Sequence, residues 1–339
     1  MENQHGSLAT WKVILNMDTT SPWQDRTQVR FPSGHRYCVN VFAGPCPHKC
    51  GYCYASLYQR GEPRLKADFP GLIDEDIRHL EQYDVPPAPI HLSNSTDPFQ
   101  ELERHCGHTR YALEQVLAHR RRFTMVTILT KNPLLAAKQG YLDLFRALSV
   151  LPADHPCYGE FSARSLPAFQ VQVSMAFWRE PPRAAYDPCA PTIAERVEGI
   201  CALRDAGIPV ILRIDPLFPR SPLPLIPSKT MAEFGLVEAQ TLDDLRQLLE
   251  FARLRGVPHV VYSPVKIVFP RGSGLNDTMM ALLRVYRALA APGKPIWRGM
   301  SWRIPPMIAE EHVVRPFLEL CHEIGVRAKF CMQDLIDIR

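Results

Sequence analysis

The segment around which this chain is organised runs from Cys46 to Cys53 and reads CPHKCGYC. Its three cysteines follow the spacing C-x3-C-x2-C, and an aromatic residue, Tyr52, stands directly before the last of them. An apolar run, Tyr37 to Phe42, precedes the segment and ends at a Gly-Pro pair. Thiolates gathered in one loop after a strand end can converge on one soft metal centre. The spacing therefore predicts a metal or iron–sulfur site.

The kind of metal is constrained by the number of ligands. Structural zinc takes four protein ligands, commonly in two separated pairs, and the sequence holds no second C-x2-C. His48 lies inside the first cysteine pair, which is a poor position from which to close a tetrahedron. Three thiolates suit a four-iron cluster in which one iron has no protein ligand. A zinc-binding module without enzymatic activity and a disulfide framework stay open as alternatives.

Length and composition place the chain among globular proteins. Its 339 residues suit one large α/β domain of barrel type or two average domains. The net charge of +4 neither requires nor excludes an anionic substrate. No apolar run of 18 residues exists and residues 1–20 hold no apolar signal core, so we expect no membrane span. Ten cysteines without such a signal predict reduced thiols and a cytoplasmic location.

Strand-like and helix-like stretches alternate along most of the chain. The expected strands are Tyr37 to Phe42, Pro89 to Ser93, Phe123 to Leu129, Phe169 to Met175, Val210 to Ile214 and His259 to Ser263. Helical stretches separate them, and one of these opens with a capping box at Thr192 and Glu195. Repeated βα units predict an α/β fold with a parallel sheet.

Three regions follow from this pattern. We expect an N-terminal extension over 1–34, a barrel-like core over 35–265 and a C-terminal extension over 266–339. The last region is predicted to hold two helices, Asn276 to Ala290 and Glu310 to Glu323, and a short final strand, Val326 to Cys331, that covers the barrel.

Polar residues follow most of the predicted strands. In parallel α/β folds the chemistry collects at the carboxyl ends of the strands. The residues nominated by that rule, besides the cysteine loop, are Ser95, Thr96, Asp97, Lys131, Ser174 and Arg213. Structural alternatives stand beside them: Asp97-Pro98 as a turn, Lys131 as a solvated cation, Ser174 as a packing residue and Asp215 as the partner of a buried Arg213.

With these residues in place, the chain resembles the radical SAM superfamily, whose signature is the same cysteine triple. The segment CPHKCGYCY, a strand ending in STDPFQ and a strand ending in TK are similar to the spore photoproduct lyase-like branch. The segments Glu195 to Glu198, Leu203 to Val210 and Arg213 to Pro216 are similar to that branch as well. The likeness covers roughly Tyr37 to Pro216.

This resemblance implies a partial (β/α)6 TIM-type barrel, with N- and C-terminal extensions, that binds a [4Fe-4S] cluster and S-adenosylmethionine (SAM). Cys46, Cys50 and Cys53 would hold the cluster, whose open iron would bind the amino and carboxylate groups of SAM. Ser95, Thr96 and Asp97 suit the ammonium group of SAM, and Lys131 or Arg213 suits its carboxylate. Tyr52 is a candidate to face the adenine, and Ser174 is a further strand-end hydroxyl for the cofactor.

The implied activity is reductive cleavage of SAM, which starts radical chemistry on a substrate that the sequence does not name. The substrate would be a small molecule or a peptide, with DNA as a further candidate, and the electron donor a flavodoxin or ferredoxin. DNA lesion repair of the lyase type and transfer of the SAM aminocarboxypropyl group are alternatives. Spore photoproduct lyase carries a cysteine at the end of its second strand as hydrogen donor, and Leu92 to Ser95 has none, which argues against the lyase reaction itself.

A cysteine elsewhere in the chain is a candidate for the hydrogen donor that the second strand lacks. Cys331 lies on the last strand-like stretch, where it can reach the barrel mouth as hydrogen donor or substrate contact. The structural alternative is a buried thiol that acts as a small apolar side chain. The proline-rich stretch Pro216 to Pro227, after the fifth expected strand, is either a roof over the site or a plain surface loop.

Overall fold

The computed structural model describes residues 37–57, 59, 61–82, 87–93, 95–138, 140–268, 274–290, 296–298 and 301–331. The expected N-terminal extension, 1–34, lies outside these described residues. A seven-stranded sheet in the order β1-β4-β5-β6-β7-β8-β12 forms the centre of the fold. Its strands are β1 (Tyr37–Val39), β4 (Ala88–Leu92), β5 (Phe123–Thr130), β6 (Phe169–Ser174), β7 (Val210–Leu217), β8 (Val260–Pro264) and β12 (Ala328–Phe330).

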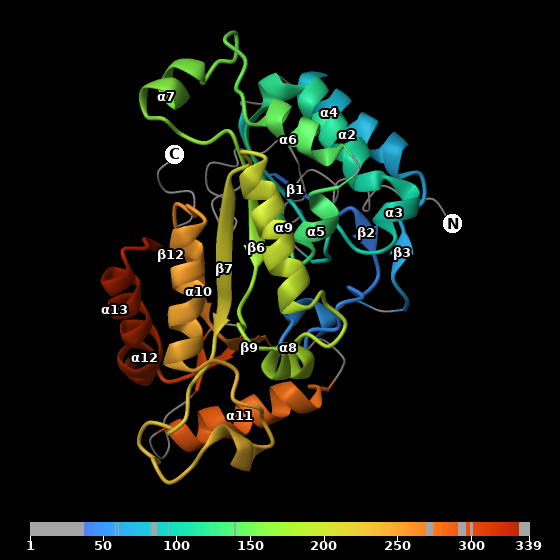
Figure 1. The fold of residues 1–339 in the computed structure, drawn as a ribbon. Coiled ribbons are helices and arrows are strands. Elements are labelled where there is room, and N and C mark those ends of the chain that lie inside the picture. Colours follow the sequence, from blue (N-terminus) through green and yellow to red (C-terminus); the bar gives the residue numbers. More distant parts are fainter. Residues whose placement is uncertain are drawn as a thin grey trace.

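All neighbouring strands of this sheet run parallel. A parallel pair needs a crossover, and helices supply the crossovers here (Figure 1). The main crossover helices are α2 (Phe69–Gln82), α4 (His108–Ala118), α5 (Pro133–Ala136), α6 (Tyr141–Leu148), α9 (Ile193–Asp205), α10 (Leu242–Leu254) and α13 (Arg315–Ile324). The predicted α/β class with a partial barrel is confirmed.

Shorter helices occupy several connections. They are α3 (Glu103–Cys106), α7 (Tyr158–Ala163), α8 (Glu180–Tyr186) and four short turns of other pitch: η2 (Tyr54–Leu57), η3 (Arg120–Arg122), η4 (Met231–Phe234) and the π-helix η5 (Ala309–Val314). The apolar spacing of the sequence predicts a helix from Thr109 to Arg122, but α4 ends at Ala118. The backbone tightens there into the separate turn η3.

The strand register separates an apolar face from a polar one. Val39, Leu92, Ile128, Val171 and Val210 are register partners across five strands, and all are buried in the main hydrophobic core. Side chains alternate between the two faces of a strand. The positions between these residues therefore share the opposite face of the sheet. On β6 that opposite face carries Gln170, Gln172 and Ser174, so it is lined by polar groups.

The start of helix α9 and its packing against α5 place the side chain of Arg196 at the end of β6. The predicted capping box is present, because Thr192 Oγ1 accepts from Glu195 N at 3.2 Å and Glu195 Oε2 accepts from Thr192 N at 2.8 Å. Further along, a Cβ on Gly199 would lie 2.2 Å from Leu134 N. Only glycine permits this approach of α9 to α5. Arg196, one turn earlier, is thereby held against the end of β6.

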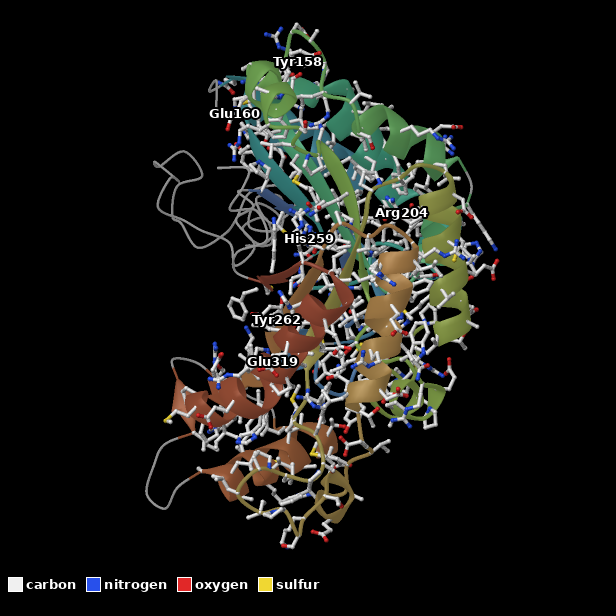
Figure 2. The ribbon with its side chains drawn as sticks, turned by 60° about the vertical axis from the view of Figure 1, so that its left-hand side comes forward. Tyr158, Glu160, Arg204, His259, Tyr262 and Glu319 are labelled. Atoms are coloured by element: carbon white, nitrogen blue, oxygen red, sulfur yellow. The ribbon has the colours of Figure 1, made fainter. Side chains whose placement is uncertain are left out.

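The C-terminal part holds α11 (Asp277–Leu289) and α12 (Pro306–Ile308) besides η5 and α13. Strand β12 pairs with β8 at the edge of the sheet, where the sequence places the last strand. Tyr262 of β8 contacts Phe317 of α13 at a ring distance of 5.3 Å and Phe330 of β12 at 5.8 Å. Figure 2 shows Tyr262 beside this C-terminal helix. The extension is thus anchored to the sheet edge by aromatic contacts.

Two small antiparallel sheets were not predicted. One pairs β2 (Phe42–Ala43) with β3 (Arg64–Leu65), and the other joins β9 (Lys266–Val268), β10 (Trp297–Arg298) and β11 (Ser301–Arg303). Each strand has only two or three residues, which is too short to show a sequence period. Among the described residues, no helix has the length and apolar character needed to cross a membrane.

Candidate cofactor site at the carboxyl ends of the strands

The cysteine loop lies beyond β1 and β2 and turns twice. Lys49 N donates to Cys46 O at 3.4 Å, and Cys53 N donates to Cys50 O at 3.1 Å. All three thiols are free and partly buried. Burial raises the pKa of Cys46 to about 12 and that of Cys50 well above its ordinary value, and the neighbouring thiols contribute to both shifts. The three sulfurs are therefore close enough to interact electrostatically.

His48 connects this loop to two other segments. Its Nε2 lies 3.0 Å from Asp97 Oδ2, beyond the end of β4. Its carbonyl oxygen accepts from Cys189 N at 3.3 Å, in the connection between α8 and α9. Gly51 N donates at 2.8 Å to the carbonyl oxygen of Tyr186, the last residue of α8. The loop is thus held on both sides by parts of the chain far from it in sequence.

Asp97 is the centre of a hydrogen-bond network. Besides His48, its carboxylate accepts from Thr130 Oγ1 at 2.7 Å, from Lys131 N at 2.6 Å and from Phe99 N at 2.9 Å. Burial by itself would raise the pKa of Asp97, but His48 and the donors around it outweigh burial and lower that pKa. In this structure the carboxylate therefore joins the cysteine loop to the ends of β4 and β5.

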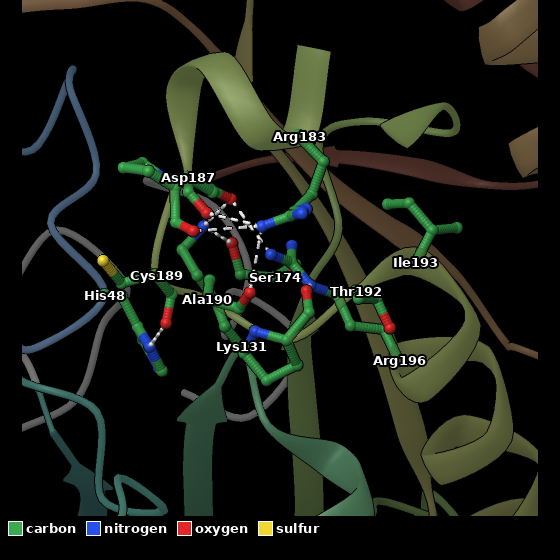
Figure 3. Close-up of polar contacts among 12 residues, drawn as sticks. His48, Lys131, Ser174, Arg183, Asp187, Cys189, Ala190, Thr192, Ile193 and Arg196 are labelled. Carbon is green, nitrogen blue, oxygen red and sulfur yellow. Dashed lines mark hydrogen bonds and ion pairs between the residues drawn. The ribbon is translucent and has the colours of Figure 1, made fainter. Parts of the chain in front are cut away.

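Lys131 brings together residues that the sequence nominated separately. Its Nζ lies 2.8 Å from Tyr52 Oη, 3.0 Å from Ser174 Oγ and 3.0 Å from Asp187 Oδ2. The Nζ atom also lies 5.4 Å from the centre of the Tyr52 ring. Figure 3 shows Lys131, Ser174 and Asp187 pointing toward one another. The ammonium group is thus oriented at the carboxyl end of the sheet.

Two members of this group were missed by the sequence analysis. Asp187 is fully buried, and Arg196 Nη2 donates to its Oδ2 at 3.2 Å while Arg196 Nη1 donates to Ser174 O at 3.1 Å (Figure 3). Burial would raise the pKa of Asp187, but Lys131 and Arg196 outweigh burial and hold that pKa well below its usual range. Two cations face one carboxylate, so the group carries excess positive charge. The only feature of the sequence that pointed to either residue was the similarity of Glu195 to Glu198, which includes Arg196, to the lyase-like branch.

The remaining nominated residues near β4 differ in their surroundings. Ser95 N donates to Asn40 Oδ1 at 3.0 Å, and Ser95 O accepts from Gln59 Nε2 at 3.2 Å. The Thr96 hydroxyl is buried and has no hydrogen-bond partner in the described part of the chain. Buried hydroxyls normally have a partner, so that of Thr96 is available to a ligand.

Aromatic rings surround Tyr52. Its ring meets that of Phe218 edge-on at 5.7 Å and that of Phe177 edge-on at 6.3 Å. Tyr186 packs on both of these rings, at 4.8 Å and 5.5 Å. Aromatic pairs favour such edge and tilted arrangements. The ring of Tyr52 is therefore fixed in an apolar wall, while its hydroxyl faces Lys131.

Arg213 and Cys331 form a second polar group on the neighbouring strands. Arg213 Nη1 donates to Gln172 Oε1 at 2.8 Å, and its Nη2 donates to Asp215 Oδ2 at 2.7 Å and to Cys331 Sγ at 2.8 Å. Ser174 and Arg213 are register partners on β6 and β7, so this group lies directly beside the Lys131 group. Asp215 is thus the partner of Arg213 that the sequence offered as the structural alternative.

The thiols of the cysteine loop suit an iron–sulfur cluster better than a single metal ion. In the described part of the chain, no three His, Cys, Asp or Glu side chains are grouped so as to hold a single metal ion. A four-iron cluster makes a different demand, because each thiolate binds a different iron. Three neighbouring thiols on one loop, held by His48 and Gly51, meet that demand in number and chemistry.

Comparisons with known proteins support the fold. No protein-family model matches the chain, and no curated protein matches it. Among solved structures it is similar to a spore photoproduct lyase variant with bound AdoMet and dinucleoside spore photoproduct, with 11% identity, a TM-score of 0.57, and coverage of 90% of this chain and 80% of that one. A spore photoproduct lyase complexed with dinucleoside spore photoproduct gives 11% identity, a TM-score of 0.56 and the same 90% and 80% coverage. At the level of the fold, the expected resemblance to the lyase-like branch is confirmed.

Proposed function

We propose that this chain is a radical SAM enzyme that binds a [4Fe-4S] cluster through Cys46, Cys50 and Cys53. The observation that carries the proposal is the position of the cysteine loop beside the Lys131, Tyr52 and Ser174 group, at the carboxyl ends of the strands. When bound, the cluster supplies the electron that cleaves a carbon–sulfur bond of SAM. The protein binds and orients SAM and keeps water away from it.

Different residues of the site suit different groups of SAM. The excess positive charge of Lys131 and Arg196 over Asp187 suits the SAM carboxylate. The free hydroxyl of Thr96 suits the ammonium group, with Ser95 beside it in the same loop. The aromatic wall of Tyr52, Phe177 and Phe218 suits the adenine and limits the entry of water.

The electron must come from outside the chain, and we propose a flavodoxin or ferredoxin as its source. All ten cysteines are free thiols. Free thiols persist in a reducing compartment, which supports a cytoplasmic location.

The test is anaerobic reconstitution with iron and sulfide, followed by incubation with SAM and dithionite. The proposal expects about four irons per chain and cleavage of SAM. Release of 5′-deoxyadenosine and methionine identifies hydrogen-abstraction chemistry, whereas release of 5′-methylthioadenosine identifies aminocarboxypropyl transfer. A protein that takes up zinc, forms no cluster and leaves SAM intact contradicts the proposal.

DNA lesion repair is a second candidate because both similar structures contain the dinucleoside spore photoproduct. The sequence offers an argument against it, because the stretch Leu92 to Ser95 at the end of β4 holds no cysteine that could act as the hydrogen donor of the lyase. The discriminating measurement is turnover of dinucleoside spore photoproduct by the reconstituted protein. Consumption of SAM without conversion of that dinucleoside favours a small-molecule or peptide substrate.

Replacing Lys131 by alanine tests the SAM site. We expect SAM affinity to fall by roughly 1.5–3 kcal/mol, about 10- to 150-fold, because a hydrogen bond to a charged group is lost. Binding is measured by equilibrium dialysis on reconstituted protein, with iron content measured in parallel. Lys138→Ala removes an exposed lysine of the same segment and should leave the affinity unchanged. If Lys131→Ala binds SAM like the parent, Lys131 serves only its ion pair with Asp187.

Replacing Cys331 by alanine tests the proposed role of that thiol. Burial raises the pKa of Cys331, and Arg213 opposes the effect. The thiol is therefore protonated at neutral pH, the form that a hydrogen donor needs. We expect Cys331→Ala to keep its cluster and to cleave SAM while forming less product, or a different one. Product formation equal to that of the parent, or lost only together with folding, would show that Cys331 serves packing alone.

A further inference from the structure

A cavity outside the cofactor site lies at the same end of the sheet. It has a volume of about 180 Å³ and lies between the proline-rich loop that follows β7 and the segment from Ile304 to Pro316. Four prolines and five aliphatic side chains form most of its wall, and the polar residues that line it are Arg220, Ser221 and His312. Figure 1 shows this loop, in yellow, beside α11 and α12. The cavity is therefore largely apolar, with one guanidinium in its wall.

Arg220 is only partly hydrogen-bonded within the part of the chain that the structure describes. Its Nη2 donates to His312 O at 2.8 Å and to Val313 O at 3.4 Å, both in the π-helix η5. Its Nη1 is buried and has no hydrogen-bond partner in the described part of the chain. Buried donors without a partner are rare in native proteins and call for an explanation. π-Helical turns occur often at functional sites, which makes this position informative.

The acidic groups nearby do not satisfy that nitrogen. Glu238 is the acidic residue whose charge acts on Arg220, where it opposes the lowering of the arginine pKa by burial. Both carboxylate oxygens of Glu238 accept from Ser221 N, at 3.1 Å and 3.3 Å. Glu311 pairs with the exposed ring of His312 at 3.9 Å. Arg220 therefore keeps its positive charge in the wall of a largely apolar cavity, and its buried Nη1 has no partner among the described residues.

We propose that this cavity binds a small organic carboxylate with an aliphatic body. A guanidinium fits a carboxylate in charge and in geometry, and the proline and aliphatic wall fits an apolar chain. Glu238 and the apolar wall disfavour a doubly charged phosphate. The site needs no cluster, so it stands apart from the proposed SAM chemistry.

The position of the site links it to the cofactor pocket. Arg220 follows Phe218 by two residues, and Phe218 contacts Tyr52 in the aromatic wall. The amide of Phe218 is also fixed, because its N donates to Gln240 Oε1 at 2.9 Å. A ligand held by Arg220 would therefore contact the same loop that carries Phe218 of the aromatic wall.

The test uses the cluster-free full chain. The probe is 4-methylpentanoate, and its binding is measured by calorimetry. The neutral 4-methylpentanamide should bind more weakly on the order of tenfold or more, because it lacks the charge. Arg220→Gln should cause a similar loss of affinity for the acid. Arg315→Gln, which removes an exposed arginine of the same segment, should bind like the parent.

A second variant keeps the test decisive if Arg220→Gln fails to fold. Ile308→Phe fills the cavity and leaves Arg220 in place. It should abolish binding of the acid. Equal binding of acid and amide, undiminished binding to either variant, or no binding of the acid to the parent would each overturn the proposal.

Discussion

Replacing Cys46, Cys50 and Cys53 together with alanine is expected to reduce the iron content of the reconstituted protein from about four atoms per chain to none. The three thiols stand on one loop, interact electrostatically and are free of disulfides. Without thiolates the loop has no soft ligands for iron. Iron and sulfide assays measure the outcome, and visible absorption of the reconstituted protein follows it independently.

Cys189→Ala is the matched control for this experiment. Cys189 is an exposed thiol whose backbone contacts His48 of the loop, so its removal changes the thiol count without touching the motif. This variant should keep the full iron content. A triple variant that keeps four irons, or a control that loses them, would show that other residues bind the cluster. The unfolding curve of each variant checks that the fold is intact.

The sheet was predictable because its signals are local. β5 is a largely apolar run that ends at Thr130, β7 begins with the apolar residues Val210 to Leu212, and the capping box at Thr192 marks the start of α9. Repeated βα units then leave few arrangements other than a parallel sheet. The strands β9, β10 and β11 lack such signals, because pairing with one another, rather than any sequence period, defines them.

The grouping of polar residues around Lys131 was predictable only where those residues follow strand ends. Parallel strands bring their carboxyl ends together, so Tyr52, Asp97, Lys131 and Ser174 were found from their places in the chain. Asp187 lies in a connection, 56 residues after Lys131, and Arg196 lies within a helix. Their contacts depend on how α9 packs on α5, and no local pattern reports that packing.

The second large effect is expected from Asp187→Asn, which should lower the free energy of unfolding by about 3–5 kcal/mol. Asparagine keeps the size of the side chain but removes the charge. The fully buried Arg196 and the mostly buried Lys131 would then lack the carboxylate that now lies 3.2 Å and 3.0 Å from them. Urea unfolding of the cluster-free protein gives the difference. Asp143→Asn, which removes an exposed carboxylate paired with Arg146, should cost less than about 1 kcal/mol.

The loss of stability in Asp187→Asn is expected to depend on pH. The pKa of Asp187 in the folded protein lies well below its usual value, because Lys131 and Arg196 outweigh the effect of burial. A lowered folded-state pKa adds stability above the unfolded pKa of about 3.9 and loses it as the pH falls toward the folded value. The difference between parent and Asp187→Asn should therefore be constant from about pH 5 to 8 and shrink below about pH 4. A small difference at neutral pH would mean that Tyr52 and Ser174 suffice to hold Lys131, and that Asp187 is not what orients it.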